Sequence, residues 1–148
     1  MIVRWIFAAV HLLALGIGLG AVWARARHFG SPLDNATLRR LFAADAWWGV
    51  AALLWIGTGL TRLLAGLEKD LDYYLGSTPF QVKMALLGAI LLLEVGPMAT
   101  LIRWRVRYAR GQALDTRRAR AFATISYLQA LCVIAMVFAA TAMARGFW

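Results

Sequence analysis

The sequence predicts an all-α protein, an integral membrane bundle of four helices. Hydrophobic residues make up 62% of its 148 residues, and the mean hydropathy is +0.68, whereas soluble domains usually have about half their residues apolar. Apolar stretches of about 20 residues, the length that a helix needs to cross a bilayer, occur at residues 3–22, 46–64, 80–102 and 122–143. Because a segment in lipid must satisfy its own backbone hydrogen bonds, each stretch is expected to be a helix.

The distribution of charge predicts how the bundle is oriented. The net charge is +9, and most of the basic residues lie in or beside the first and third connections. Short basic loops stay on the cytoplasmic side, so these two connections are expected there. The second connection is acidic through Glu68, Asp70 and Asp72. We therefore expect both termini outside (periplasmic), and we expect the charge to serve topology and not nucleic-acid binding. Eleven of the 16 Lys and Arg residues lie in or beside the first and third connections: Arg25, Arg27, Arg39, Arg40, Arg103, Arg105, Arg107, Arg110, Arg117, Arg118 and Arg120.

The first apolar segment is predicted to be a retained helix. Its apolar region is too long for a signal peptide, and no small-residue cleavage site comes after it. Within it, Gly16 and Gly20 form a pair of small residues that lets another helix pack closely. We expect one transmembrane domain over residues 1–148, with helices at about 3–27, 36–65, 79–110 and 116–145.

The second helix begins after a clear break. Pro32 ends the first helix, because proline lacks an amide proton and restricts the residue before it, and Asp34 or Asn35 is expected to cap the second helix. Trp47 and Trp48 are predicted to lie at the inner membrane boundary, where indoles favour the headgroup region. One stripe runs along this helix at intervals of three or four residues: Asp45, Trp48, Ala52, Trp55, Gly59 and Arg62.

Helix-end signals define the last two helices. Thr78 is predicted to be the N-cap of the third helix, with Pro79 at its first position, and Pro97 is expected to kink it. Gly111 is a suitable left-handed C-cap, and Asp115 is expected to cap the fourth helix. That helix carries its own stripe of Gln129, Cys132, Met136, Ala139 and Met143.

The candidate functional residues lie at different depths. At about 1.5 Å rise per residue, His11 and Met136 both lie roughly 13 Å from the outer boundary, Lys83 about 5 Å and Glu94 roughly 21 Å. This permits a cofactor-binding site for haem b, with His11 as a ligand of the haem iron and Met136 or another group opposite it. Lys83 and Arg62, near the outer face, would then pair with the haem propionates.

Two other functions are open at this point. Intramembrane acids and histidines form proton relays, so His11 and Glu94, with Asp45 and Arg62, are candidates for a proton-coupled or small-solute transporter. In place of a relay, Glu94 could form a buried polar clamp with His11 or a tryptophan indole that fixes helix packing. The second function is a non-enzymatic accessory subunit of a larger membrane complex, or a homo-oligomer, whose glycine and tryptophan stripes dock other helices. Glu94, Asp45 and Gln129 are predicted to be buried polar side chains in either case.

Four segments carry a resemblance to a known family. HLLALGIGLGAVWARAR, FAADAWWGVAALLWIGTGLTR, GLEKDLDYYLGSTPFQVKM and LLLEVGPMATLIRWR together resemble an uncharacterised family of small four-helix bacterial inner-membrane proteins. More distantly, the chain is similar to four-helix bacterial protoporphyrinogen oxidases and copper-resistance D membrane domains, with His11 and Lys83 in places comparable to the oxidases' helix-one histidine and helix-three lysine. These resemblances imply a multi-pass protein of the bacterial inner (cytoplasmic) membrane and, through the oxidases, haem b binding for electron transfer or porphyrin oxidation.

Overall fold

Four long helices make up the part of the chain that the computed structural model describes, residues 2–64 and 76–146. They are α1 (Ile2–Gly30), α2 (Asn35–Leu64), α4 (Thr78–Ala109) and α5 (Ala119–Ala144). Each is long and apolar enough to cross a membrane, and the predicted all-α four-helix bundle is confirmed. Residues 65–75, which hold the acidic residues of the second connection, lie outside the described part.

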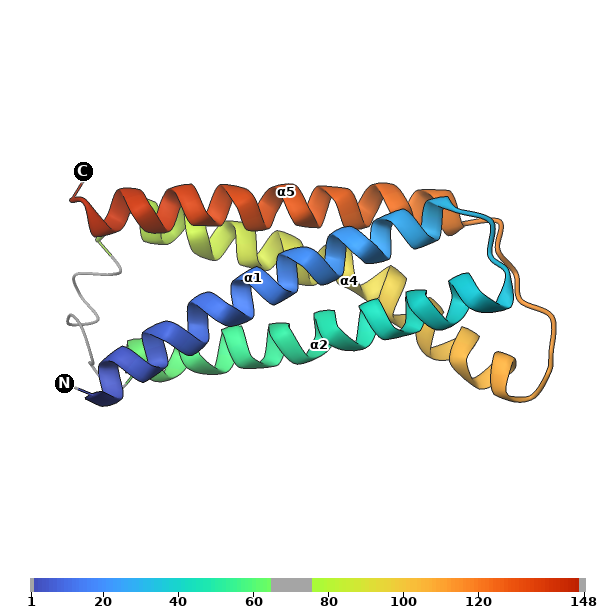
Figure 1. Cartoon of the computed structure of the whole chain (residues 1–148). Helices are drawn as coiled ribbons and strands as arrows, with labels where there is room; N and C mark the ends of the chain where they lie inside the picture. Colours follow the sequence, from blue (N-terminus) through green and yellow to red (C-terminus); the bar gives the residue numbers. More distant parts are fainter. Residues whose placement is uncertain (1, 65–75, 147–148) are drawn as a thin grey trace.

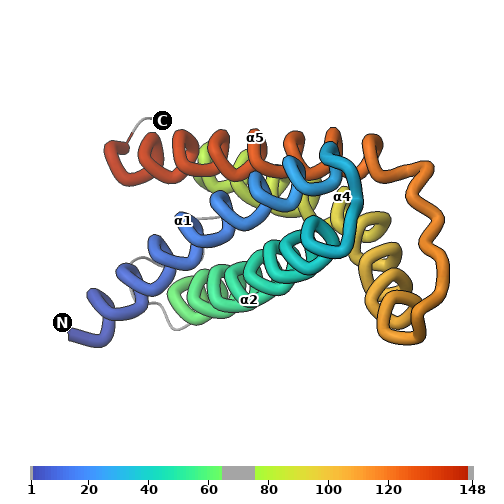
Figure 2. Tube along the Cα trace, turned by 45° about the vertical axis from the view of Figure 1, so that its right-hand side comes forward, coloured from blue at the N-terminus to red at the C-terminus, as the bar shows by residue number. Residues whose placement is uncertain are grey.

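The helices run back and forth along one bundle axis (Figure 1). α1 packs against α2 and α5, and α4 packs against α5. The start of α1 and the end of α5 lie at one end of the bundle, called here the terminal end. The connections at residues 31–34 and 110–118 lie at the other end, called here the basic end. Figures 1 and 2 show α1 and α5 close together at the basic end and diverging towards the terminal end.

Side-chain and backbone caps explain two of the helix ends. Asp34 caps α2, because its carboxylate accepts a hydrogen bond from the Thr37 amide at 2.7 Å, as predicted. Gly111 ends α4 with a positive φ of 65°. The amides of Gly111 and Gln112 donate to the carbonyls of Tyr108 and Arg107, which is the Schellman arrangement.

Two capping predictions were wrong in detail. Ser77, in an extended conformation, is the N-cap of α4, and Thr78 is already helical; Pro79 fits there because the first-turn amides have no intrahelical partner anyway. α5 begins at Ala119, with Arg118 as its N-cap. Asp115 instead holds the preceding turn, where its Oδ1 accepts a hydrogen bond from the Arg117 amide at 3.2 Å.

Pro97 lies inside α4 and is buried. In both views the helix changes direction near its middle, in the yellow part of the ribbon (Figures 1 and 2). Proline removes one backbone hydrogen bond and its ring displaces the preceding turn, so a bend is expected at this position. The bend swings the last turns of α4 away from the bundle axis towards the basic end.

Glycine provides one close helix contact, although not at the predicted pair. A Cβ atom on Gly18 of α1 would lie 3.3 Å from the Cβ of Ala51 on α2 and 3.5 Å from the Trp48 ring. Gly16 and Gly20 have no such neighbour within 4 Å and lie on the exposed face. Within the described chain, Gly18 therefore provides the close approach that was expected at Gly16 and Gly20.

Candidate functional site

A fully buried arginine organises the half of the bundle nearer the basic end. Arg25 of α1 has no exposed surface. Its two Nη atoms bind the two carboxylate oxygens of Glu94 on α4, at 2.7 and 2.8 Å, and Nη1 also binds Asp45 of α2 at 2.9 Å. The second oxygen of Asp45 pairs with Arg105 at 2.9 Å. Two arginines thus balance two carboxylates, which reduces the high cost of charge at membrane depth.

Neutral side chains complete this Arg25 cluster. The amide oxygen of Gln129 accepts from Arg25 at 2.7 Å, and its nitrogen donates to Glu94 at 2.7 Å and to the carbonyl of Ile90 at 3.2 Å. Ser126 accepts a hydrogen bond from the Arg25 Nε at 3.2 Å. The Trp48 indole donates to Glu94 at 3.0 Å. All four helices therefore contribute to one fully hydrogen-bonded network.

This network settles the position of several predicted residues. Glu94, Asp45 and Gln129 come together, and the predicted polar clamp at Glu94 exists, with the Trp48 indole as one partner. Trp48 is 4% exposed, and its indole points into the bundle towards Glu94 and not outwards to lipid headgroups. Its neighbour Trp47 is 58% exposed.

His11 does not join Glu94. It lies 14 residues before Arg25 on α1, which is about 21 Å along the helix. The guanidinium of Arg25 and the indole of Trp48 take the places at Glu94 that the clamp hypothesis gave to His11. The structure therefore contains two separate polar sites, one at each half of the bundle.

The second site begins with the imidazole of His11, which is 8% exposed. Its Nδ1 lies 2.9 Å from the Oγ1 of Thr58 on α2, and that hydroxyl lies 2.6 Å from the carbonyl oxygen of Leu54. A carbonyl can only accept, so the hydroxyl proton points to Leu54 and Thr58 accepts from His11 Nδ1–H. In the neutral imidazole, the lone pair of the ring is then on Nε2.

A cavity adjoins His11 in the half of the bundle near the terminal end. It has a volume of about 440 Å³ and lies mainly between α1 and α5, where these helices diverge. Trp55, Met136, Arg62 and Lys83 also line it. Smaller cavities of about 100 and 60 Å³ reach the same His11 and Lys83 from the α2–α4 side. We call this space the His11 cavity.

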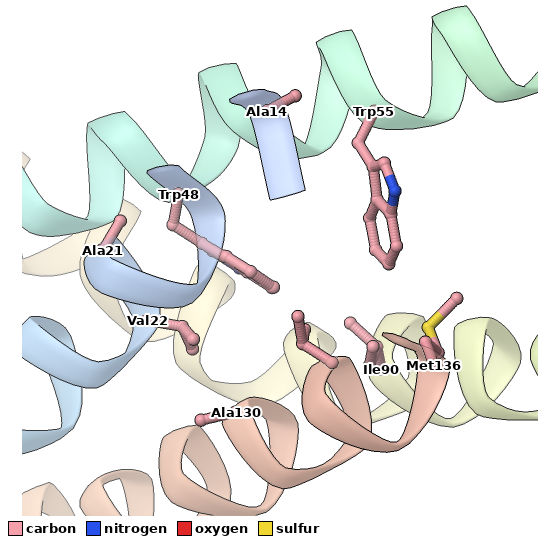
Figure 3. Packing of buried hydrophobic residues seen from close by; sticks show 9 residues of the cluster. Ala14, Ala21, Val22, Trp48, Trp55, Ile90, Ala130 and Met136 are labelled. Atoms are coloured by element: carbon pink, nitrogen blue, oxygen red, sulfur yellow. The ribbon is translucent and has the colours of Figure 1, made fainter. Parts of the chain in front are cut away.

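The walls of the His11 cavity are largely aromatic and apolar, and they include the buried indole of Trp55. Trp55 is 6% exposed and its ring centroid lies 6.0 Å from that of His11. Figure 3 shows its indole reaching from α2 towards Met136 on α5. The buried Nε1 of Trp55 has no hydrogen-bond partner among the described residues. Buried donors are normally paired, so this indole N–H is available to a bound molecule.

Gly59 of α2 lets the His11 ring pack closely against that helix. Gly59 lies against His11, and a Cβ atom there would come within 3.3 Å of the imidazole Cε1. Glycine therefore lets the ring lie against α2, next to Thr58.

Arg25 is the functional-site residue that the sequence reasoning missed. It was assigned to the basic residues beside the first connection, although His11, Gly18 and Arg25 are spaced by seven residues. Residues seven apart lie on nearly the same face of a helix. His11 and Gly18 are buried on that face, so the spacing was a signal that Arg25 points inward.

The fold and the two polar sites define a class of protein: a four-helix integral membrane protein with a buried ion network and a separate intramembrane cavity. Residues 3–147 match a family described as "Predicted membrane protein (DUF2214)". Since the match covers nearly the whole chain, the protein belongs to this family. No curated protein and no solved structure shows significant similarity to it.

Proposed function

We propose that the protein binds a tetrapyrrole with acidic side groups, haem b in particular, in the His11 cavity, for electron transfer or porphyrin oxidation. The observation that carries this proposal is the position of His11. With the proton of the neutral imidazole on Nδ1, the lone pair is on Nε2, and His11 lines a cavity of about 440 Å³ together with Met136. Histidine nitrogen and methionine sulfur are a known pair of haem ligands.

The other residues of the cavity also fit this group. Thr58 fixes the tautomer and orientation of His11 from behind, the role that second-layer hydrogen bonds have at metal sites. Arg62 and Lys83 supply cations for acidic substituents. The volume lies in the range of about 300–1,000 Å³ that ligand sites usually have. A bound haem would supply one-electron chemistry, while the apolar walls keep water from it.

An absorption spectrum of the detergent-purified protein tests the proposal. Protein from haem-replete cells is expected to show a Soret band, which His11→Ala abolishes and Met136→Leu shifts or weakens. His28→Ala is the matched control, because His28 is the second of the two histidines and lies at the last turn of α1, far from the cavity. Colourless wild-type protein that also fails to bind added haem would refute the proposal.

A relay that passes protons directly between His11 and Glu94 has less support. The Glu94 carboxylate is bound by three side chains of the Arg25 cluster, about 20 Å from His11 along the bundle. Transport coupled to the His11 cavity alone would show as pH-dependent flux in liposomes that Glu94→Gln does not change.

We also propose that the protein lies in a bacterial inner membrane with both termini outside. The connections at the basic end and the helix ends beside them carry most of the arginines, and basic loops stay in the cytoplasm. Fusions of a reporter that is active only in the periplasm test this topology. The reporter is expected to be highly active when fused after Trp148 and weakly active when fused at Gln112. The reverse pattern would overturn the proposed topology.

A further inference from the structure

The basic end of the bundle contains a pocket that the proposed function does not use. It has a volume of about 310 Å³ and lies between the last turns of α4 and the start of α5. We call it the arginine pocket. Its lining residues are Thr100, Arg103, Trp104 and Arg107 of α4 and, after that helix, Asp115, Arg117, Arg118 and Phe122.

The floor of the arginine pocket is rigid and apolar. Trp104 and Phe122 are 3% and 7% exposed, and both contact Phe29 of α1, with ring centroids 6.0 and 5.7 Å away. Arg103 and Arg107 are one helical turn apart and therefore share a face of α4. The pocket is thus a preformed hollow with cations at its rim.

The charges at this rim are not balanced among the residues that the structure describes. Four arginines face one carboxylate, and Asp115 is occupied by Arg117, whose Nε and Nη2 lie 2.9 and 2.8 Å from its two oxygens. Within residues 2–64 and 76–146, the guanidinium groups of Arg107 and Arg118 form no hydrogen bond or ion pair. Guanidinium groups gathered in this way match a phosphate, which accepts several charge-assisted hydrogen bonds.

The surroundings of the pocket indicate which phosphate is bound. Ile102 and Val106, which alternate with the arginines on α4, are 52% and 46% exposed, and α4 is one of the membrane-spanning helices. The arginines therefore lie where an apolar, lipid-facing surface ends. Basic pockets between transmembrane helices at this level bind lipid headgroups.

We propose that the arginine pocket binds the phosphate headgroup of an anionic phospholipid from the leaflet at the basic end. The phosphate contacts Arg107 and Arg118, and the acyl chains lie along Ile102 and Val106. This site is independent of the His11 cavity, so it stands whether or not a tetrapyrrole is bound there.

Native mass spectrometry of lipid adducts tests the proposal on the full chain in neutral detergent. Wild-type protein is expected to prefer phosphatidylglycerol to phosphatidylcholine. Arg107→Gln with Arg118→Gln is expected to weaken phosphatidylglycerol binding about thirtyfold, from roughly fivefold per cation. The matched control, Arg110→Gln with Arg120→Gln, removes the same charge from the same end outside the pocket and should change binding by less than about threefold. Equal losses in both double variants, or equal binding of the two lipids, would overturn the proposal.

A competition experiment distinguishes a lipid headgroup from a soluble phosphate as the ligand of the arginine pocket. Glycerophosphoglycerol, the deacylated headgroup, and inorganic phosphate are added in competition with phosphatidylglycerol. Failure of both to displace the lipid at tenfold excess supports a lipid site. Displacement by either at equimolar concentration would show that the pocket takes a soluble anion, and the lipid assignment would be wrong. Circular dichroism on each variant checks that helix content is unchanged.

Discussion

The two Nη atoms of Arg25 bind the two carboxylate oxygens of Glu94, at 2.7 and 2.8 Å, across 69 residues of sequence. This bidentate pair joins α1 to α4, two helices that otherwise make few contacts, while Asp45 and Gln129 extend it to α2 and α5. Such a pair contributes geometric specificity as well as energy, because planar guanidinium and carboxylate groups match in only a few orientations. The Arg25 cluster therefore fixes how the four helices are arranged.

Replacing Arg25 with Met should destabilise the bundle strongly. The variant leaves Glu94 as a charge inside the bundle without its main partner, and breaking a buried pair in this way costs about 3–5 kcal/mol. The free energy of unfolding in mixed detergent micelles measures the effect. Adding Glu94→Gln to Arg25→Met should restore most of the lost stability, because a neutral amide can still bond to Trp48 and Gln129. A double variant as unstable as the single one would contradict the explanation.

Replacing Trp48 with Phe should have a smaller effect. Phenylalanine keeps an aromatic ring at this position, but the indole hydrogen bond to Glu94 at 3.0 Å and part of the ring that packs against Gly18 are lost. Side-chain hydrogen bonds inside membrane proteins average about 0.6 kcal/mol and reach about 1.7 kcal/mol, so we expect a loss of at least this size that stays below the loss in Arg25→Met. Trp47→Phe, on the exposed neighbour, is the control and should leave the free energy of unfolding unchanged. Equal effects of the two substitutions would show that the Glu94 hydrogen bond contributes nothing.

These two residues also show how far the sequence predicts the site. Hydropathy fixed the four helices, because twenty apolar residues in lipid have few alternatives to a helix. The predicted stripe along α2 groups Asp45, Trp48 and Trp55, and all three point into the bundle. Periodicity therefore groups residues that share a face, but by itself it does not say that this face is the inward one.

Arg25 could not be paired from the sequence in the same way. A helix-end arginine before a basic connection is typical of topology-determining residues, and spacing alone does not say that it binds both Asp45 and Glu94. The pairing depends on how α4 crosses α1, which the bend near Pro97 influences. The depth estimate was more successful for His11 and Met136, because both line the same cavity.

Replacing Thr58 with Val should change the tautomer of His11. Valine has nearly the same shape but accepts no hydrogen bond, so the preference for Nδ1–H over Nε2–H is lost. Nitrogen-15 NMR of the imidazole groups measures this directly, since the chain has two histidines and His28→Ala assigns the signals. In the wild-type protein without added haem, the His11 Nδ1 should carry the proton. An Nε2–H signal there would contradict the assigned tautomer.

Asp115 should control the affinity of the arginine pocket without making it depend on pH in the physiological range. The Arg117 side chain, followed by its backbone amide, lowers the pKa of the Asp115 carboxyl from 3.8 to about 2. A lowered pKa means that the interaction with Arg117 is fully present above the ordinary value and is lost only as the pH falls through about 2. Phosphatidylglycerol binding should therefore be unaffected by Asp115 titration between about pH 5 and 8.

Replacing Asp115 with Asn should strengthen phosphatidylglycerol binding by about fivefold, because it removes a negative charge from the pocket and releases Arg117 to the phosphate. Asp34→Asn is the matched control: it makes the same change in charge at the other connection of the basic end, and Asn can still cap α2. Titrations of both variants by native mass spectrometry at neutral pH compare them. If Asp115→Asn weakens binding, the carboxylate takes part in holding the headgroup in place, and the pocket is not the simple cluster of cations that its geometry indicates.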